Sequence, residues 1–140
     1  MLAPLLANPA LKPGPSAISA ASKASLELLR LRYSSPLFRL GSAALIRQKV
    51  SFLTSGPSQA PGVVAMQIDD RIGYRVDSRL QRMVVVFNAS TAAATVAVPG
   101  AAGLRLSPVQ ASGADPVVKR STVTAGSVTV PARTVAVFVQ

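Results

Sequence analysis

The 140-residue chain is long enough for one modest domain, or for a small domain attached to part of a larger one. Its 49% hydrophobic content and mean hydropathy of +0.41 exclude intrinsic disorder by composition. Cysteine and histidine do not occur, which excludes disulfides, a thiolate nucleophile, a zinc–thiolate site and a Ser-His-Asp triad. Most self-contained enzyme mechanisms are therefore excluded before any motif is considered.

The net charge of +10 would ordinarily indicate nucleic acid or an anionic membrane as a partner. The basic residues are scattered, however, and the densest group, Arg71, Arg75, Arg79 and Arg82, includes a single aromatic residue, Tyr74. Nucleic-acid modules usually combine a compact basic face with stacking aromatic side chains, so we do not expect a nucleic-acid partner. The sequence also lacks the ~20 continuous apolar residues of a membrane span, and we expect no membrane partner.

The first eleven residues resemble a targeting segment only superficially. Prolines interrupt their short apolar run, and no basic residue precedes it. Serine and arginine, which are typical of organellar transit peptides, do not occur there. We therefore expect no targeting segment in this sequence.

Leucine and valine are segregated, which predicts a helical front and a β-rich back. Eleven of the fifteen leucines lie in residues 1–45, and seventeen of the eighteen valines lie after residue 60. Leucine fits a helix at little entropic cost, whereas β-branched valine fits a pleated sheet. One main helix is predicted over residues 16–33, with Ser16 as its N-cap and an end enforced by Pro36. Its expected apolar stripe includes Ile18, Leu26, Leu28 and Leu29.

A short helical turn is expected at residues 42–47, and valine-rich runs separated by turn residues then predict about eight strands. The expected strands are residues 48–53, 62–68, 82–88, 95–98, 104–108, 117–123, 127–130 and 134–139. The second and third runs are almost continuously apolar, as strands buried on both faces are. Their spacing indicates a mainly β fold, an antiparallel β-sandwich. The expected core comprises Val63, Met66, Val84, Val86, Phe87, Val135 and Val137.

The chain has five carboxylates, and three of them lie close together in sequence. Asp69 and Asp70 are adjacent, so in a strand they point to opposite faces and cannot act as a pair. With Asp77 they could form a calcium-binding loop. The four nearby arginines instead favour a solvated, charge-balanced turn.

The remaining polar motifs have structural interpretations. Glu27 is expected to pair with Lys23 or Arg30 along the helix, and Asp115 to occupy a turn. Asn88 begins a glycosylation pattern but ends a strand that should be buried, so chance explains the pattern better. We predict no catalytic, cofactor-binding or metal-binding residue in this chain.

Residues 28–40, LLRLRYSSPLFRL, resemble a stretch of pullulanase-type starch debranching enzymes, or limit dextrinases. Further matches follow in the same order at residues 4–13, 56–66, 84–89, 108–110, 115–118 and 130–138. The resemblance covers nearly the whole chain and is weakest over residues 69–81. It implies the C-terminal piece of these enzymes, which consists of the last helix of a catalytic (α/β)8 barrel followed by a β domain.

The family hydrolyses α-1,6 linkages in starch-type glucans with an Asp nucleophile and a Glu acid/base in its barrel, and no catalytic motif of the barrel occurs here. The resemblance implies that residues 1–40 are a remnant of the end of the barrel and residues 41–140 a C-terminal β-sandwich domain that supports it. The catalytic barrel is the implied partner, with α-glucan contacted only through the parent enzyme and no cofactor. Similarity to plant and algal forms implies a plastid location.

A second hypothesis is a freestanding basic β-sandwich that binds a glycan, a protein or nucleic acid. The chain has no tryptophan and only two tyrosines, so the usual stacking platform for sugars is poorly represented. The helix at residues 16–33 distinguishes the two hypotheses. A domain built to stand alone has little reason to keep the closing helix of an absent barrel.

Overall fold

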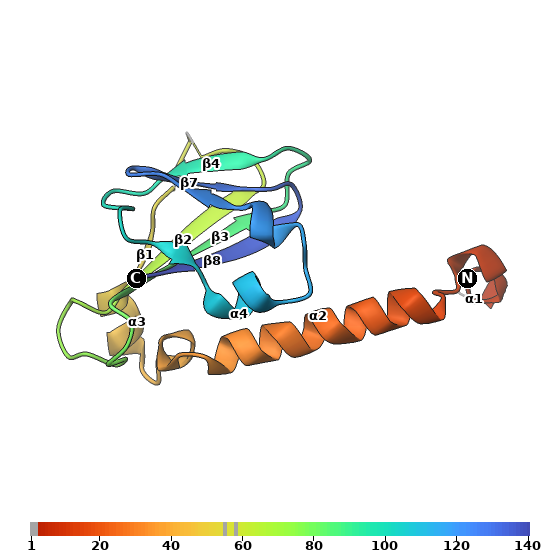
Figure 1. Cartoon of the computed structure of the whole chain (residues 1–140), viewed down its shortest axis with the longest axis horizontal. Helices are drawn as coiled ribbons and strands as arrows, with labels where there is room; N and C mark the ends of the chain where they lie inside the picture. Colours follow the sequence, from red (N-terminus) through yellow and green to blue (C-terminus); the bar gives the residue numbers. More distant parts are fainter. Residues whose placement is uncertain (1–2, 55, 58) are drawn as a thin grey trace.

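A long helix precedes a two-sheet β-sandwich in the computed structural model, which describes residues 3–54, 56–57 and 59–140 (Figure 1). Every strand pair is antiparallel, so the predicted mainly β, antiparallel fold with one preceding helix is confirmed. Ser58, which belongs to one of the family-like segments, lies outside the described residues.

The described part of the chain contains eight strands in two sheets. Sheet A has the order β1-β2-β3-β8-β5, and sheet B has the order β4-β7-β6. The strands are β1 Val50–Phe52, β2 Val63–Asp69, β3 Arg82–Asn88, β4 Ala94–Ala97, β5 Arg105–Leu106, β6 Thr122–Val123, β7 Ser127–Val130 and β8 Thr134–Val139. Each overlaps a predicted strand, and the shortest three, β1, β5 and β6, have two or three residues each.

The helical segments are α1 Ala3–Ala7, η1 Pro9–Leu11, α2 Pro15–Tyr33, η2 Pro36–Arg39, α3 Ala43–Lys49, α4 Pro108–Ser112 and η3 Val118–Arg120. The predicted end of α2 at Tyr33 is confirmed, but Ser16 is not its N-cap. Gly14 holds that position because Pro15, whose φ is already helical, starts the helix one residue earlier. The predicted turn at residues 42–47 is α3, which Ser42 caps by accepting a hydrogen bond from the Leu45 N–H at 3.2 Å.

The main core lies between the two sheets. Alternate residues of β2, β3 and β8 point inward, and the register places Ala65, Val86 and Ala136 side by side. Sheet B contributes inward-facing valines from β4 and β7. Val63, Val84 and Val86 of the predicted core are buried here, and Val137 is buried on the outer face of sheet A.

The opposite, outer face of sheet A is also apolar, which explains the nearly continuous apolar sequences of β2 and β3. Leu31 and Leu37, from the end of α2 and from η2, cover the part that contains Ile68, Met83 and Val139. The rest of this face is not covered to the same extent. Two predicted core residues on it, Phe87 and Val135, are 44% and 38% exposed, so their assignment to the core was wrong. Met66, also predicted for the core, is half-buried and packs against the buried residues of this face.

Helix α2 runs beneath the sandwich, and its N-terminal end projects beyond it together with α1 (Figure 1). Leu31, near the C-terminal end, is the one buried residue among the nineteen of α2. Among the described residues, no helix has both the length and the apolar character needed to cross a bilayer. Most helix stability comes from packing an apolar face, and α2 packs a large apolar side chain, Leu31, only near its C-terminal end. The apolar anchor of the helix on the sandwich therefore lies at that end.

We expect limited trypsin digestion to cut first after Lys23, and to leave a resistant fragment that contains the sandwich; the bond after Lys12 precedes Pro13 and is not a trypsin site. Lys23 is exposed and precedes the end of α2 that Leu31 buries, so local opening there disturbs little packing. Mass spectrometry of the early products would identify the cuts. Simultaneous cleavage within β3 or β8 would contradict the expected difference in stability.

Candidate functional site

The uncovered part of the outer face of sheet A forms an apolar patch. Val64, Phe87 and Val135 are direct cross-strand neighbours on β2, β3 and β8. Phe52 on β1, which pairs with Met66 on β2, continues the same face. We call these four side chains, which are 37–57% exposed, the outer patch. Clustered exposed apolar residues on a soluble domain usually mark an interaction surface.

Helix α2 carries a second group of exposed apolar side chains, turned away from the sandwich. Ile18, Leu26, Leu29 and Tyr33 recur at spacings that place them on one side of the helix, and we call them the helix stripe. They are 49–65% exposed. The Arg39 guanidinium lies 4.8 Å from the centre of the Tyr33 ring and covers one end of the stripe.

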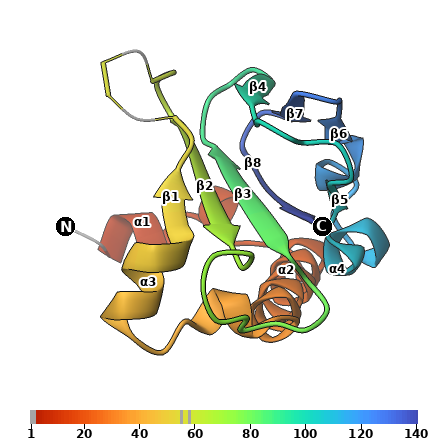
Figure 2. The same ribbon diagram turned by 90° about the vertical axis from the view of Figure 1, so that its left-hand side faces the viewer.

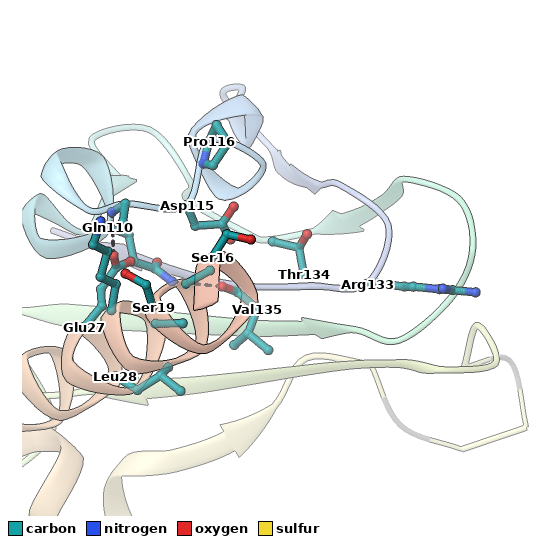
Figure 3. A pocket seen from close by; sticks show the side chains of 14 residues that line it. Ser16, Ser19, Glu27, Leu28, Gln110, Asp115, Pro116, Arg133, Thr134 and Val135 are labelled. Carbon is teal, nitrogen blue, oxygen red and sulfur yellow. Dashed lines mark hydrogen bonds between the residues drawn. The ribbon is translucent and has the colours of Figure 1, made fainter. Parts of the chain in front are cut away.

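The side of α2 that faces the sandwich carries mostly small or polar residues. They line a cleft of about 720 Å³ between α2, α4 and the start of β8 (Figure 3). Ser16, Ser19 and Glu27 lie on the helix side of the cleft, and Val135 of the outer patch lies on the strand side. Among the bulky apolar residues of α2, Leu31 is buried on sheet A and Leu28 lines this cleft, whereas those of the helix stripe do not hold the helix on its own sandwich.

Glu27 anchors α2 in a way that the sequence did not predict. Its carboxylate accepts a hydrogen bond from the backbone N–H of Ala114 at 2.7 Å, instead of pairing with Lys23 or Arg30. A Cβ atom at Gly113 would collide with this carboxylate, so any larger residue there would displace the Glu27 side chain from its present position. The helix is therefore attached to the segment after α4 by a contact across 87 residues of sequence.

The loop of residues 70–81 corrects a prediction, because two of its acids are buried and not solvated. It joins β2 to β3 and curves toward the end of α2 (Figure 2). The fully buried Lys49 ammonium lies 3.0 Å from the Asp70 carboxylate and donates to the Ile72 carbonyl at 2.6 Å. Asp77, 3% exposed, accepts a hydrogen bond from the Ser35 hydroxyl at 2.6 Å.

The hydrogen bonds of this loop stabilise the ionised form of both acids. Burial would raise the pKa of the Asp70 carboxyl, but the N–H groups of Asp77 and Val76, together with the Lys49 ammonium, hold that pKa below its ordinary value. At Asp77, burial likewise acts to raise the pKa of the carboxyl, but the pKa is lowered overall, with the hydrogen bond from Ser35 as the largest lowering contribution. Both carboxylates are thus charged at neutral pH.

The arginines of the same region are used largely within the chain. Arg71 pairs with Asp69 at 2.6 Å, Arg75 donates to the Asp77 and Leu80 carbonyls, and Arg79 donates to the Ser34 carbonyl. Arg82 is 3% exposed and donates to the Gln67 side chain and the Gly100 carbonyl. The side chains of Arg71, Arg75 and Arg79 remain 45–71% exposed, but each is paired with one of the three aspartates, so the densest basic group in the sequence is charge-balanced.

The acids do not converge on a possible metal or catalytic centre. Asp69 and Asp70 have different partners, as their adjacent positions predicted. Over the described ranges, no group of three or more acidic side chains could hold a metal ion. Asp115 accepts a hydrogen bond from the Val117 N–H within a turn, which confirms the prediction for that residue.

The glycosylation pattern lies in an inaccessible place. Asn88 is 2% exposed, and its amide nitrogen donates to the carbonyls of Ala92, Val130 and Pro131. This asparagine connects the end of β3 to the segments around β4 and β7. A structural role explains the residue without a glycan.

The family model for the C-terminal region of pullulanase-type α-1,6-glucosidases matches residues 1–140. The chain belongs to this family. Pullulanase 1, a chloroplastic protein of Arabidopsis thaliana, is 41% identical over 151 aligned residues, and the Klebsiella pneumoniae pullulanase is 36% identical over 116. The ligand-free crystal structure of PulA from K. pneumoniae superposes on this pullulanase-type domain with a TM-score of 0.84, at 36% identity and over 91% of the chain.

The domain is similar to only a small part of these relatives. It spans 15% of the Arabidopsis protein, 11% of the Klebsiella protein and 12% of the PulA crystal chain. The matching segments in the relatives are therefore parts of much longer pullulanases. Most of each relative lies outside the matching segment, so a relative contains further protein that could cover the surface corresponding to the outer patch and the helix stripe.

Proposed function

We propose that this pullulanase-type domain stabilises the catalytic barrel of an enzyme that hydrolyses α-1,6 linkages in starch-type glucans. The observation that carries the proposal is the apolar surface formed by the helix stripe and the outer patch, which the described residues leave exposed. A helix that turns its largest apolar side chains away from its own sandwich is suited to pack in a second protein layer.

In this proposal, residues 1–40 belong to the end of the barrel and residues 41–140 form the supporting β-sandwich. The contacts of the helical part favour such a division: α2 is exposed along most of its length, whereas Leu31 and Leu37 fix its end to sheet A. The nearby carboxylates are occupied by structural partners, which favours a domain without catalytic residues. The similarity to a chloroplastic pullulanase supports a plastid location.

The isolated chain is expected to release no reducing sugar from pullulan above the level of a heat-inactivated sample. Hydrolysis of a glycosidic bond needs two convergent carboxyl groups that are free to act on the substrate. The carboxylates of Asp69, Asp70 and Asp77 are buried and bound to structural partners, and that of Glu27 binds the Ala114 N–H. A chimeric Arabidopsis pullulanase 1, in which this chain replaces the matching segment, is expected to be active. Reproducible oligosaccharide release by the isolated chain would contradict the assignment of a purely supporting role.

The same chimera tests the apolar surface. Replacing Leu26 and Leu29 of the helix stripe with serine should reduce the yield of folded, active chimera about tenfold or more, because each change would leave a polar group in a buried contact. The control carries Thr95→Ser and Ala97→Ser on the exposed side of β4. Equal activity and thermal stability of the two variants would show that the helix stripe does not pack against the barrel.

A further inference from the structure

The buried acids of loop 70–81 join three elements that are distant in sequence. Lys49 is the last residue of α3, Ser35 follows α2, and Asp70 and Asp77 lie between β2 and β3. We call these four residues the polar clasp. Its side-chain contacts are the Lys49–Asp70 pair at 3.0 Å and the Ser35–Asp77 hydrogen bond at 2.6 Å.

The two halves of the clasp are connected through the backbone. The N–H of Asp77 donates to the Asp70 carboxylate at 2.9 Å, and the second oxygen of the Asp77 carboxylate accepts a hydrogen bond from the Arg79 N–H at 2.8 Å. Arg79 in turn donates to the Ser34 carbonyl at the end of α2. The end of the helix is thus tied to the loop by both a side chain and a backbone carbonyl.

The clasp restrains α2 in a different way from the apolar contacts. Leu31 and Leu37 are buried on sheet A, but hydrophobic contacts are not directional and tolerate a range of helix angles. The Ser35 hydroxyl also accepts a hydrogen bond from the Leu37 N–H at 3.1 Å, which fixes the turn from α2 into η2. A serine bound on both sides, with no exposed surface, permits little change in that turn.

We propose that the polar clasp sets the direction in which α2 leaves the sandwich, with Ser35 and Asp77 as its positioning residues. Apolar contacts keep the helix end on the sheet, and the clasp selects one orientation of the helix. This inference concerns the chain alone and does not depend on the identity of the protein that covers the helix stripe.

The natural absence of cysteine permits a direct test by spin labelling. Cysteines at Ser25, on the exposed side of α2, and at Ala97, on the exposed side of β4, report the distance between the helix and the sandwich. We expect one narrow distance distribution in the otherwise unchanged protein. Ser35→Ala or Asp77→Asn should increase the population of displaced orientations about tenfold, because a hydrogen bond to a charged group is lost or weakened.

Matched controls make the same chemical changes outside the clasp. Ser112→Ala removes a hydroxyl that, among the described residues, donates to the Pro108 and Val109 carbonyls within α4. Asp115→Asn changes the exposed turn at the rim of the cleft. Both should keep the narrow distribution. Hydrogen exchange of β3 and β8, measured in every variant, should remain unchanged.

Two results would overturn the proposal. An unchanged distance distribution in both Ser35→Ala and Asp77→Asn would show that the apolar contacts and the Glu27–Ala114 hydrogen bond direct the helix without the clasp. Broadening accompanied by equally faster exchange in β3 and β8 would show that these residues support the whole fold and do not specifically position α2. Ser35→Ala is the smaller change, so it keeps the test valid if Asp77→Asn does not fold.

Discussion

Replacing Phe138 with alanine is expected to lower the free energy of unfolding by about 3–5 kcal/mol. The side chain has no exposed surface and lies on the inner face of β8, between the two sheets. Its removal would leave a cavity bordered by valines that two hydrogen-bonded sheets hold in place, so the cavity cannot easily collapse. Denaturant unfolding followed by circular dichroism would measure the change, which is a large part of a typical domain stability of about 5–15 kcal/mol.

Phe87→Ala is the matched control for this prediction. Phe87 lies in the neighbouring strand but points to the outer patch, where it is 44% exposed. The loss should be about 1 kcal/mol, because much of the ring is already in water. Equal losses from the two substitutions would mean that the outer patch is covered in solution, for example by self-association.

Replacing Lys49 with methionine is expected to cost about 3–5 kcal/mol at neutral pH, because the substitution leaves the buried Asp70 carboxylate without its cation. The Arg71→Met control breaks a pair whose arginine side chain is 50% exposed, and should cost about 1 kcal/mol or less. The double variant Lys49→Met, Asp70→Asn should recover part of the loss, since no buried charge then remains. Urea titrations of the three variants would measure these differences.

The Lys49 substitution should also change the response to acid. The pKa of Asp70 is lowered in the folded protein, so its contribution to stability is complete above the unfolded pKa, near 3.8, and is lost as the pH falls through the lower, folded value. Removing the ammonium raises the folded pKa, which reduces this contribution. The acid unfolding transition of Lys49→Met should therefore move to higher pH. An acid midpoint identical to that of the unmodified protein would contradict a role for this pair.

The strands could be predicted because their sequence pattern has a direct structural cause. In β3, valines occupy consecutive positions because both faces of the strand are apolar, and a run of this kind is recognisable without a structure. The exposure of Phe87 could not be predicted in the same way. It depends on how far the end of α2 and η2 extend over sheet A, which is a property of tertiary packing.

The polar clasp was misjudged for a similar reason. The arginines near Asp70 and Asp77 in the sequence indicate a solvated turn. In the structure the side-chain partners of these two acids are Lys49 and Ser35, which lie more than twenty residues away in sequence. A single sequence gives no signal for such pairings. The acids are also satisfied by backbone N–H groups, which every loop possesses and no motif reveals.

The helix was predicted with nearly correct limits, and the structure leaves the four residues of its expected apolar stripe exposed. The face that meets the sandwich was harder to recognise, because it consists mostly of serine, alanine, one lysine and one glutamate, with Leu28 and Leu31 as its large apolar residues. Small residues permit close approach without a strong hydrophobic pattern. Glu27 finds its partner at Ala114, a backbone group that charge patterning along the helix cannot identify.

The position of β8 within sheet A has a consequence for synthesis on the ribosome. This strand lies between β3 and β5, although it follows both in sequence, and its register with β3 joins Val84 to Phe138. Until β8 has emerged from the exit tunnel, β3 has one unpaired edge and an open apolar face on each side. The nascent chain thus carries exposed strands that are prone to aggregation while most of the domain has already been translated. Folding of the sandwich should accordingly be a late event that depends on this strand, and chaperones that hold exposed apolar segments have a defined interval in which to act.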